Sequence, residues 1–141
     1  MTIQQGLTNS FKQEMLQAGQ NLLTDTLYMS LYTGFSDIGP STTAYTTTNE
    51  VTGTGYTAGG AQVTGAVLST DTQTGTVYVN FDNVSWPGAS FTARGALIYN
   101  VTQSNASIAV LDFGSDKTFN SVNNTVTMPV NSATTALIRF P

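Results

Sequence analysis

The sequence predicts an all-β protein, either an antiparallel β-sandwich or a jelly-roll-like barrel of about seven or eight strands, with one N-terminal helix. Three observations lead to this fold class. Apolar and polar residues alternate in short runs, residues typical of turns separate these runs, and no helical pattern lies between them that could connect parallel strands. With 141 residues, the chain fits a single domain over 1–141.

The segment 7–23 is the one part of the chain with a helical period. Its apolar side chains recur at every third or fourth position and are Leu7, Phe11, Met15, Ala18 and Leu22. Either Asn9 or Ser10 is suited to cap the first turn. We therefore expect one amphipathic helix over 7–23, with Gly19 as the point at which it can be interrupted.

The strands begin after Asp25, where the apolar period changes to two. Leu27, Met29 and Leu31 alternate with Tyr28, Ser30 and Tyr32. Further strands are expected at 62–69, 76–81, 90–99, 107–113, 125–130 and 134–140, so that the sandwich covers 26–140. The segment 41–60 is too polar and glycine-rich for a core strand, and its spaced tyrosines favour a long ordered loop.

The composition argues against catalysis. The chain has no His, no Cys, four Lys plus Arg and eight Asp plus Glu, although His and Cys supply most groups that titrate near neutral pH and many nucleophiles. Only 9% of residues are charged, against about 25% in ordinary domains. We therefore predict a protein that is not an enzyme, has no catalytic, cofactor-binding or metal-binding residues, and is covered by neighbours in an assembly.

Charge and hydropathy exclude two classes of partner. The formal net charge is −4, and no cluster of Lys and Arg is present that could follow a phosphate backbone. No apolar run approaches the roughly 18 residues of a membrane span, and the first residues lack the pattern of a leader peptide. We predict no nucleic-acid partner, no membrane partner and a mature chain that begins at Met1.

Two charged residues lie inside apolar runs, Arg94 in 89–100 and Asp112 in 108–114. A charge in such a strand must be paired or must lie on an exposed face. We interpret Arg94 and Asp112 as a structural ion pair. Asp82 is an alternative partner, and exposed positions for both residues are the second interpretation.

The other carboxylates carry weaker signals. Four lie beside turn residues without the spacing of a calcium loop, which favours turn capping over metal binding; they are Asp37, Asp71, Asp82 and Asp116. A carboxylate pair for glycoside hydrolysis stays open, although no pattern selects one; its candidates are Glu50, Asp71, Asp82 and Asp112.

The aromatic residues allow two interpretations. Trp86 and the six tyrosines are suited to stacking on sugar rings, but a tryptophan before Pro87 and Gly88 in a small sandwich is more typical of a core or subunit contact. We expect contacts to a partner at the helix and the long loop. The candidate interface residues are Leu7, Phe11, Met15, Tyr45, Tyr56 and Trp86.

These segments resemble a group of small structural proteins of tailed bacteriophages, notably of marine and freshwater cyanophage-like viruses. The resemblance covers nearly the whole chain: LTNSFKQEMLQ (7–17), DTLYMSLYTG (25–34), TTAYTTTNEVTGTGYTAGG (42–60), the W-P and SFTARGALIY core (86–99) and AVLDFG (109–114).

The resemblance implies a virion component without catalytic function. It implies a capsid-decorating or cement protein on the outer capsid surface, made in the host cytoplasm, with a tail, neck or fibre position as the alternative. Its partners would be the major capsid protein and copies of itself, most simply in a homotrimer on three-fold points. A host-glycan recognition module is the other expectation that stays open.

Overall fold

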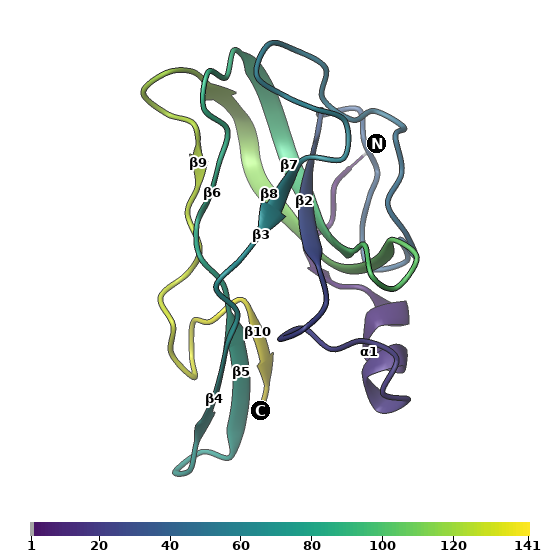
Figure 1. Ribbon diagram of the computed structural model, residues 1–141, viewed down its shortest axis with the longest axis vertical. Helices are drawn as coiled ribbons and strands as arrows, with labels where there is room; N and C mark the ends of the chain where they lie inside the picture. Colours follow the sequence, from purple (N-terminus) through teal and green to yellow (C-terminus); the bar gives the residue numbers. More distant parts are fainter. Residues whose placement is uncertain (1) are drawn as a thin grey trace.

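The computed structural model describes residues 2–141. It is an all-β sandwich with one N-terminal helix, so the predicted fold class is confirmed (Figure 1). The elements are β1 (Gly6–Leu7), α1 (Asn9–Leu16), β2 (Leu27–Tyr32), β3 (Ala61–Val63), β4 (Val67–Asp71), β5 (Thr76–Asn80), β6 (Val84–Ser85), β7 (Phe91–Asn100), β8 (Ala106–Phe119), β9 (Thr125–Val126) and β10 (Ile138–Phe140). Of these ten strands, β1, β6 and β9 have only two residues each.

One layer is a five-stranded antiparallel sheet with the order β1-β8-β7-β2-β3. Its centre is the pairing of β2 with β7, where all six residues of β2 lie opposite 95–100. Most residues of β2 and of the second half of β7 are buried, on both faces of the sheet. This double burial requires a cover on each side of the sheet.

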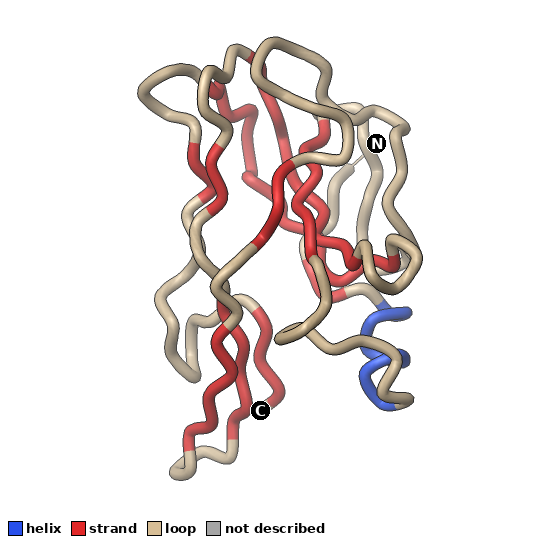
Figure 2. Tube along the Cα trace, viewed as in Figure 1, coloured by secondary structure: helices blue, strands red, loops and turns tan. Residues whose placement is uncertain are grey.

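The second layer combines a three-stranded sheet, β10-β5-β4, with the short pair β6-β9. Strands β5 and β6 follow one another along the chain and run through this layer from bottom to top (Figures 1 and 2). Asparagine side chains stabilise the chain where it is irregular between β5 and β6. Asn80 donates to the Pro129 carbonyl at 2.7 Å, and Asn83 accepts the N–H of Met128 at 2.7 Å.

The main core lies between the two layers and is rich in aromatic rings. Phe91 and Phe119 stack with ring centroids 4.9 Å apart, and Trp86 meets Phe119 edge to face at 5.7 Å. The indole N–H of Trp86 has no acceptor among the described residues, so this ring stabilises the core by packing. Phe11 anchors α1 to the same core and is fully buried.

A second, smaller core lies on the opposite face of the five-stranded sheet. Tyr32, Leu97 and Val110 provide the sheet side, while Ile3 and Ile38 cover them from the N-terminal segment and the loop after β2. Gln4 fixes this cover through a backbone hydrogen bond to Ile38 at 3.0 Å. The covered face explains why both sides of β2 are buried.

The helix is shorter than the predicted 7–23, because it covers only Asn9–Leu16. Thr8 caps it by accepting the Phe11 N–H at 3.2 Å, so neither Asn9 nor Ser10 is the cap. Ala18 adopts a φ of 56°, and the Gly19 N–H bonds the Glu14 carbonyl at 2.7 Å. A left-handed residue followed by this bond closes a helix end.

After the helix, polar side chains hold the chain against the end of β7. The buried Gln20 donates to the Ser107 carbonyl at 3.3 Å and accepts from Asn100 at 3.0 Å. Asn100 also donates to Asp25 at 2.8 Å. These tertiary hydrogen bonds replace a continuation of the helix. The apolar spacing alone does not predict them.

Several strand boundaries also differ from the predicted ranges. The expected strand 62–69 is divided into β3 and β4 by Gly65, whose φ is 71°. Strand β8 extends to Phe119 instead of ending at 113, while only 125–126 and 138–140 of the last two expected strands form ladders. The loop 41–60 contributes isolated bridges to Tyr32, Ser90 and Ala106.

The two seams of the sandwich differ. On one side β3 packs against β6, and the Asp82 N–H bonds the Thr64 carbonyl at 2.9 Å beyond the end of the β4-β5 ladder. On the other side, β1 has only β8 as a hydrogen-bonded neighbour and β10 has only β5. Both are edge strands with one unpaired side, so the sandwich is open between them.

Candidate contact surfaces

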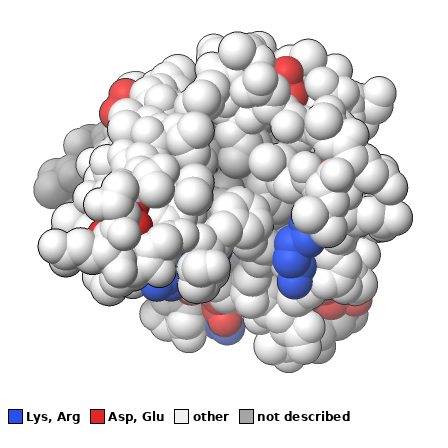
Figure 3. Space-filling view, turned by 90° about the horizontal axis from the view of Figure 1, so that it is seen from below, with Lys and Arg blue, Asp and Glu red and all other residues white. Residues whose placement is uncertain are grey.

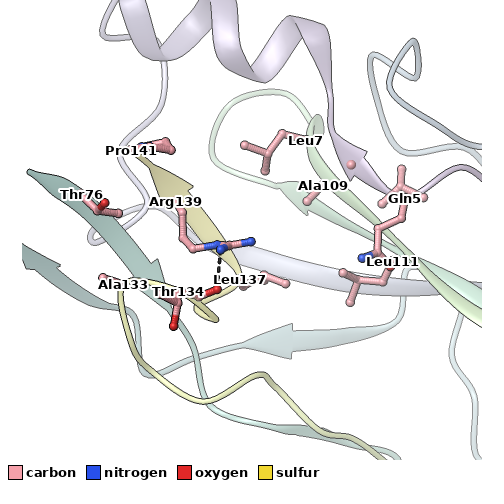
Figure 4. Close-up of a pocket in the computed structure, with 12 residues that line it drawn as sticks. Gln5, Leu7, Thr76, Ala109, Leu111, Ala133, Thr134, Leu137, Arg139 and Pro141 are labelled. Carbon is pink, nitrogen blue, oxygen red and sulfur yellow. Dashed lines mark hydrogen bonds between the residues drawn. The ribbon is translucent and has the colours of Figure 1, made fainter. Parts of the chain in front are cut away.

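The open seam contains a groove of about 560 Å³ (Figure 4). Its walls come from β1 and β8 of one layer and from β10 and the turn before it in the other. The lining residues are Gln5, Gly6, Leu7, Thr76, Ala109, Val110, Leu111, Ala133, Thr134, Leu137, Arg139 and Pro141. We call this cavity the seam groove.

Arg139 is the one charged side chain that lines the seam groove. It extends from β10 toward β8 and donates through Nη1 to the Thr134 carbonyl (Figure 4). Among residues 2–141 it has no carboxylate within salt-bridge distance. A guanidinium presents five N–H donors, so most of this fork is free for another acceptor.

A second hollow of about 430 Å³ continues the seam groove, because both are lined by Gln5, Leu111 and Leu137. Its floor is apolar and includes Phe113 and Met128. The lining also contains Lys117 and Asp112. Two of the four basic residues of the chain therefore lie along this seam.

An apolar cleft of about 240 Å³ lies between the segment after α1 and the β10-β5-β4 sheet; its lining residues are Met15, Gln20, Asn21, Leu22, Leu23, Leu68, Val77, Val79 and Phe140. Leu23, Leu68 and Phe140 are exposed, and Leu16, the last residue of α1, is 91% exposed. We call these four residues the apolar end. Seen from this side, the surface is largely uncharged and hollowed between the layers (Figure 3).

The long loop is fixed to the five-stranded sheet by Glu50. Tyr45 donates its hydroxyl to the two carboxylate oxygens at 3.0 and 2.9 Å, and the Gly59 N–H donates to them at 3.0 and 3.2 Å. Tyr99 of β7 donates to the Gly59 carbonyl at 2.6 Å and stacks on Tyr45 with centroids 4.7 Å apart. Glu50 thereby joins two parts of the loop over the sheet.

Two further tyrosines complete this attachment. Tyr32 donates to the Thr46 carbonyl at 2.7 Å, and Tyr56 accepts the Leu31 N–H at 2.9 Å. Burial, together with the charge of Glu50, raises the pKa of Tyr32 and the pKa of Tyr99 to about 12 each. The same causes raise the pKa of Tyr45 and that of Tyr56.

The predicted ion pair between Arg94 and Asp112 is wrong. Arg94 binds Asp116 at 2.8 Å, and the two side chains are 39% and 57% exposed. The register of β8 shifts by three residues between Gly95 and Ala93, and this bulge brings Asp116 to Arg94. Asp112 instead accepts the Gly114 N–H at 2.8 Å, and the pair with Asp82 is not formed either.

The candidate interface residues divide into three groups. Phe11 and Trp86 belong to the main core, at 0% and 3% exposure, so their prediction as contact residues is wrong. Tyr45 and Tyr56 are half-buried and hold the long loop. Leu7 lines the seam groove, and Met15 lines the apolar cleft.

Three of the four carboxylates considered for glycoside hydrolysis are engaged in local contacts. Asp71 accepts the Gln73 N–H at 2.9 Å, Asp112 caps its own bulge, and Glu50 holds the loop. No group of three His, Cys, Asp or Glu suited to a metal ion occurs in 2–141. Within the same residues, no helix has the length and hydropathy to cross a membrane.

Arg139 and the apolar end were missed by the sequence analysis. Arg139 carries the same sequence signal as Arg94, because it is a charged residue inside an apolar run, which extends from Leu137 to Phe140. For Leu23 and Leu68 no signal existed, because an apolar residue in a helix-like or strand-like pattern is normally interpreted as core.

Comparisons of the chain with models of protein families, with curated proteins and with solved structures gave no match. The resemblance to phage virion proteins therefore stays a prediction. The contact surfaces described above are the basis for any functional proposal.

Proposed function

We propose that this protein is a virion structural protein, most specifically a capsid decoration or cement protein that bridges neighbouring major capsid proteins on the outer surface of the head. It acts without catalysis, after synthesis in the host cytoplasm. The observation that supports this proposal is the apolar end, whose four exposed side chains come from four segments, three of which line an apolar cleft.

Exposed apolar side chains that gather at one place indicate a contact surface. Leu16, Leu23, Leu68 and Phe140 come from α1, the following segment, β4 and β10, so separate parts of the chain contribute to one end of the molecule. Most of the surface on the lower side of the molecule is uncharged (Figure 3), and burying uncharged surface against a shell involves little charge desolvation.

Oligomerisation would multiply this contact. A homotrimer presents three copies of the apolar end, so that weak individual contacts to three capsid subunits add together. A tail, neck or fibre component would use the same surface at another place in the particle. The ratio of this protein to the major capsid protein in purified virions separates these positions.

The host-glycan alternative has less support. Stacking on a sugar requires an exposed aromatic face, whereas Trp86, Tyr32 and Tyr99 are buried and Tyr45 is covered by Tyr99. The exposed aromatic residues are Phe35, at 73%, and Phe140, at 38%. A glycan array with the purified protein tests this alternative directly.

The experiment for the cement proposal uses particles that lack the protein and are then supplied with purified variants. Wild-type protein is expected to bind and to raise the temperature at which the particles release their genome. Leu23→Glu and Leu68→Glu should each reduce binding at least about tenfold. Val122→Glu is the matched control, because Val122 is 85% exposed on the loop between β8 and β9.

Particles that are equally heat-stable without the protein would exclude the cement proposal. Equal binding by all three variants would exclude the apolar end as the contact surface. The melting temperature of each variant must stay near that of the wild type, as expected for substitutions at exposed positions.

A further inference from the structure

The open seam of the sandwich lies between two edge strands. Edge strands β1 and β10 border it, and each has an unpaired side. Unpaired N–H and C=O groups of an edge strand are a template for pairing with another chain. At the opposite seam β3 packs directly against β6.

The opening is elongated along β8, as an extended chain segment requires. The seam groove and its neighbouring hollow have volumes of about 560 and 430 Å³ and share lining residues, so together they form a trough along β8. Apolar residues from both layers line it, among them Leu7, Leu111, Leu137 and Met128. An extended peptide buries alternate side chains in such a trough while its backbone pairs with an edge.

The charged residues along the trough indicate which side chain the bound segment should carry. Arg139 points into the seam groove and has no carboxylate partner within 2–141, and Lys117 lines the neighbouring hollow. Asp112 is the one acidic residue along the trough, and its Oδ1 already accepts the Gly114 N–H. An acidic side chain on the incoming strand would therefore satisfy the free donors of Arg139.

We propose that the seam groove binds an extended segment of a partner polypeptide, which alternates apolar and polar residues, pairs with the free edges of β1 and β10, and places a carboxylate against Arg139. This inference deepens the proposed function, and it rests on that function only for the source of the segment, an arm of a neighbouring virion protein. The binding itself is a property of the isolated chain.

The test begins with selection from a random nine-residue peptide library on the immobilised full-length protein. The selected sequences are expected to alternate apolar and polar residues and to contain Asp or Glu. The best sequence, made as a blocked synthetic peptide, should shift the amide NMR signals of Leu7, Leu111 and Arg139 in the labelled protein. The signals of Phe35 and Val122 should not move.

A double-substitution cycle then tests the carboxylate contact. Arg139→Gln should weaken binding about tenfold, and changing the acidic residue of the peptide to its amide should do the same, because a charge-assisted hydrogen bond is lost in each case. The two changes together should weaken binding no further than either one. Arg94→Gln is the control, because Arg94 lies outside both cavities of the seam and should leave the affinity unchanged.

Three results would overturn the inference: no enriched sequence, binding that leaves the seam signals unmoved, or equal affinity for the wild type and Arg139→Gln. Arg139 is exposed, so the variant is expected to fold, and its melting temperature verifies this. Failure here, combined with loss of particle binding by Leu23→Glu, removes the strand site and leaves the cement function. If the protein binds the peptide but is absent from purified virions, the strand site is kept and the cement function is excluded.

Discussion

The attachment of the long loop through Glu50 can be tested by removing its carboxylate. Glu50 accepts hydrogen bonds from the Tyr45 hydroxyl and the Gly59 N–H, all between 2.9 and 3.2 Å. Hydrogen bonds to a charged group contribute about 1.5–3 kcal/mol each when they are removed. Because Glu50 is partly accessible to solvent, we expect Glu50→Ala to cost about 2–4 kcal/mol.

Glu50→Gln separates charge from hydrogen bonding. The amide keeps one carbonyl acceptor for Gly59 or Tyr45 but loses the charge and the second acceptor, so we expect roughly half of the alanine effect, about 1–2 kcal/mol. For a domain of this size, a loss of about 3 kcal/mol lowers the melting temperature by roughly 10 °C.

The assay is denaturant unfolding followed by circular dichroism, with tyrosine fluorescence to report on the loop. Asp37→Asn is the matched control, because it removes the same charge at an exposed position in the loop after β2 whose carboxylate has no hydrogen bond among the described residues. Its effect should stay within about 0.5 kcal/mol. If Glu50→Ala and Asp37→Asn are equally stable, Glu50 does not hold the loop and the argument fails.

Two further predictions concern the same loop. Gly60 has a φ of 87°, and an added Cβ would collide with the Met29 carbonyl, so Gly60→Ala should destabilise the fold by at least about 3 kcal/mol; Gly75→Ala, with a φ of 75° but open space, should cost only about 1–2 kcal/mol in the same unfolding assay. The raised pKa of Tyr32 and Tyr99, about 12 against 10.0, means that the folded state keeps these protons longer than the unfolded state. The contribution of these tyrosines to the free energy of unfolding should therefore be fully present below pH 10 and should fall as the pH rises to 12, by roughly 3 kcal/mol per tyrosine. Titration of both phenols near pH 10 in the folded protein would contradict this.

The sequence predicted the fold class because the fold class depends on the periodicity of apolar residues, and this periodicity is a local property of the chain. The alternation of Leu27 to Tyr32 identified β2, and the turn residues identified most strand ends. The helix length was wrong because Gln20 and Asn100 form tertiary hydrogen bonds that end it early. Such contacts join residues far apart in the chain, and a period cannot report them.

The candidate site was predictable only in part, for a related reason. Pairing Arg94 with Asp112 rested on two charges in neighbouring apolar strands, whereas the bulge between Ala93 and Gly95 brings Asp116 to Arg94. The position of Trp86 before Pro87 and Gly88 is typical of either a core or a subunit contact, and the fold buries it in the core. Exposure of an apolar residue depends on what the rest of the fold covers, and this cannot be obtained from the residue and its neighbours alone.

The cover over the five-stranded sheet limits where this molecule can form contacts. Residues of the loop after β2, joined by Glu50 and the tyrosines, occupy the outer face that β2 and β7 would otherwise present. At the seam between β3 and β6, these two strands pack against each other. The edges of β1 and β10 and the apolar end are two contact surfaces outside this cover, and both lie beside β10, which contributes Arg139 to one and Phe140 to the other. A partner that engages one surface therefore comes close to the second, so that an arm in the seam groove and a shell against the apolar end would bind the same molecule with a combined affinity above that of either contact.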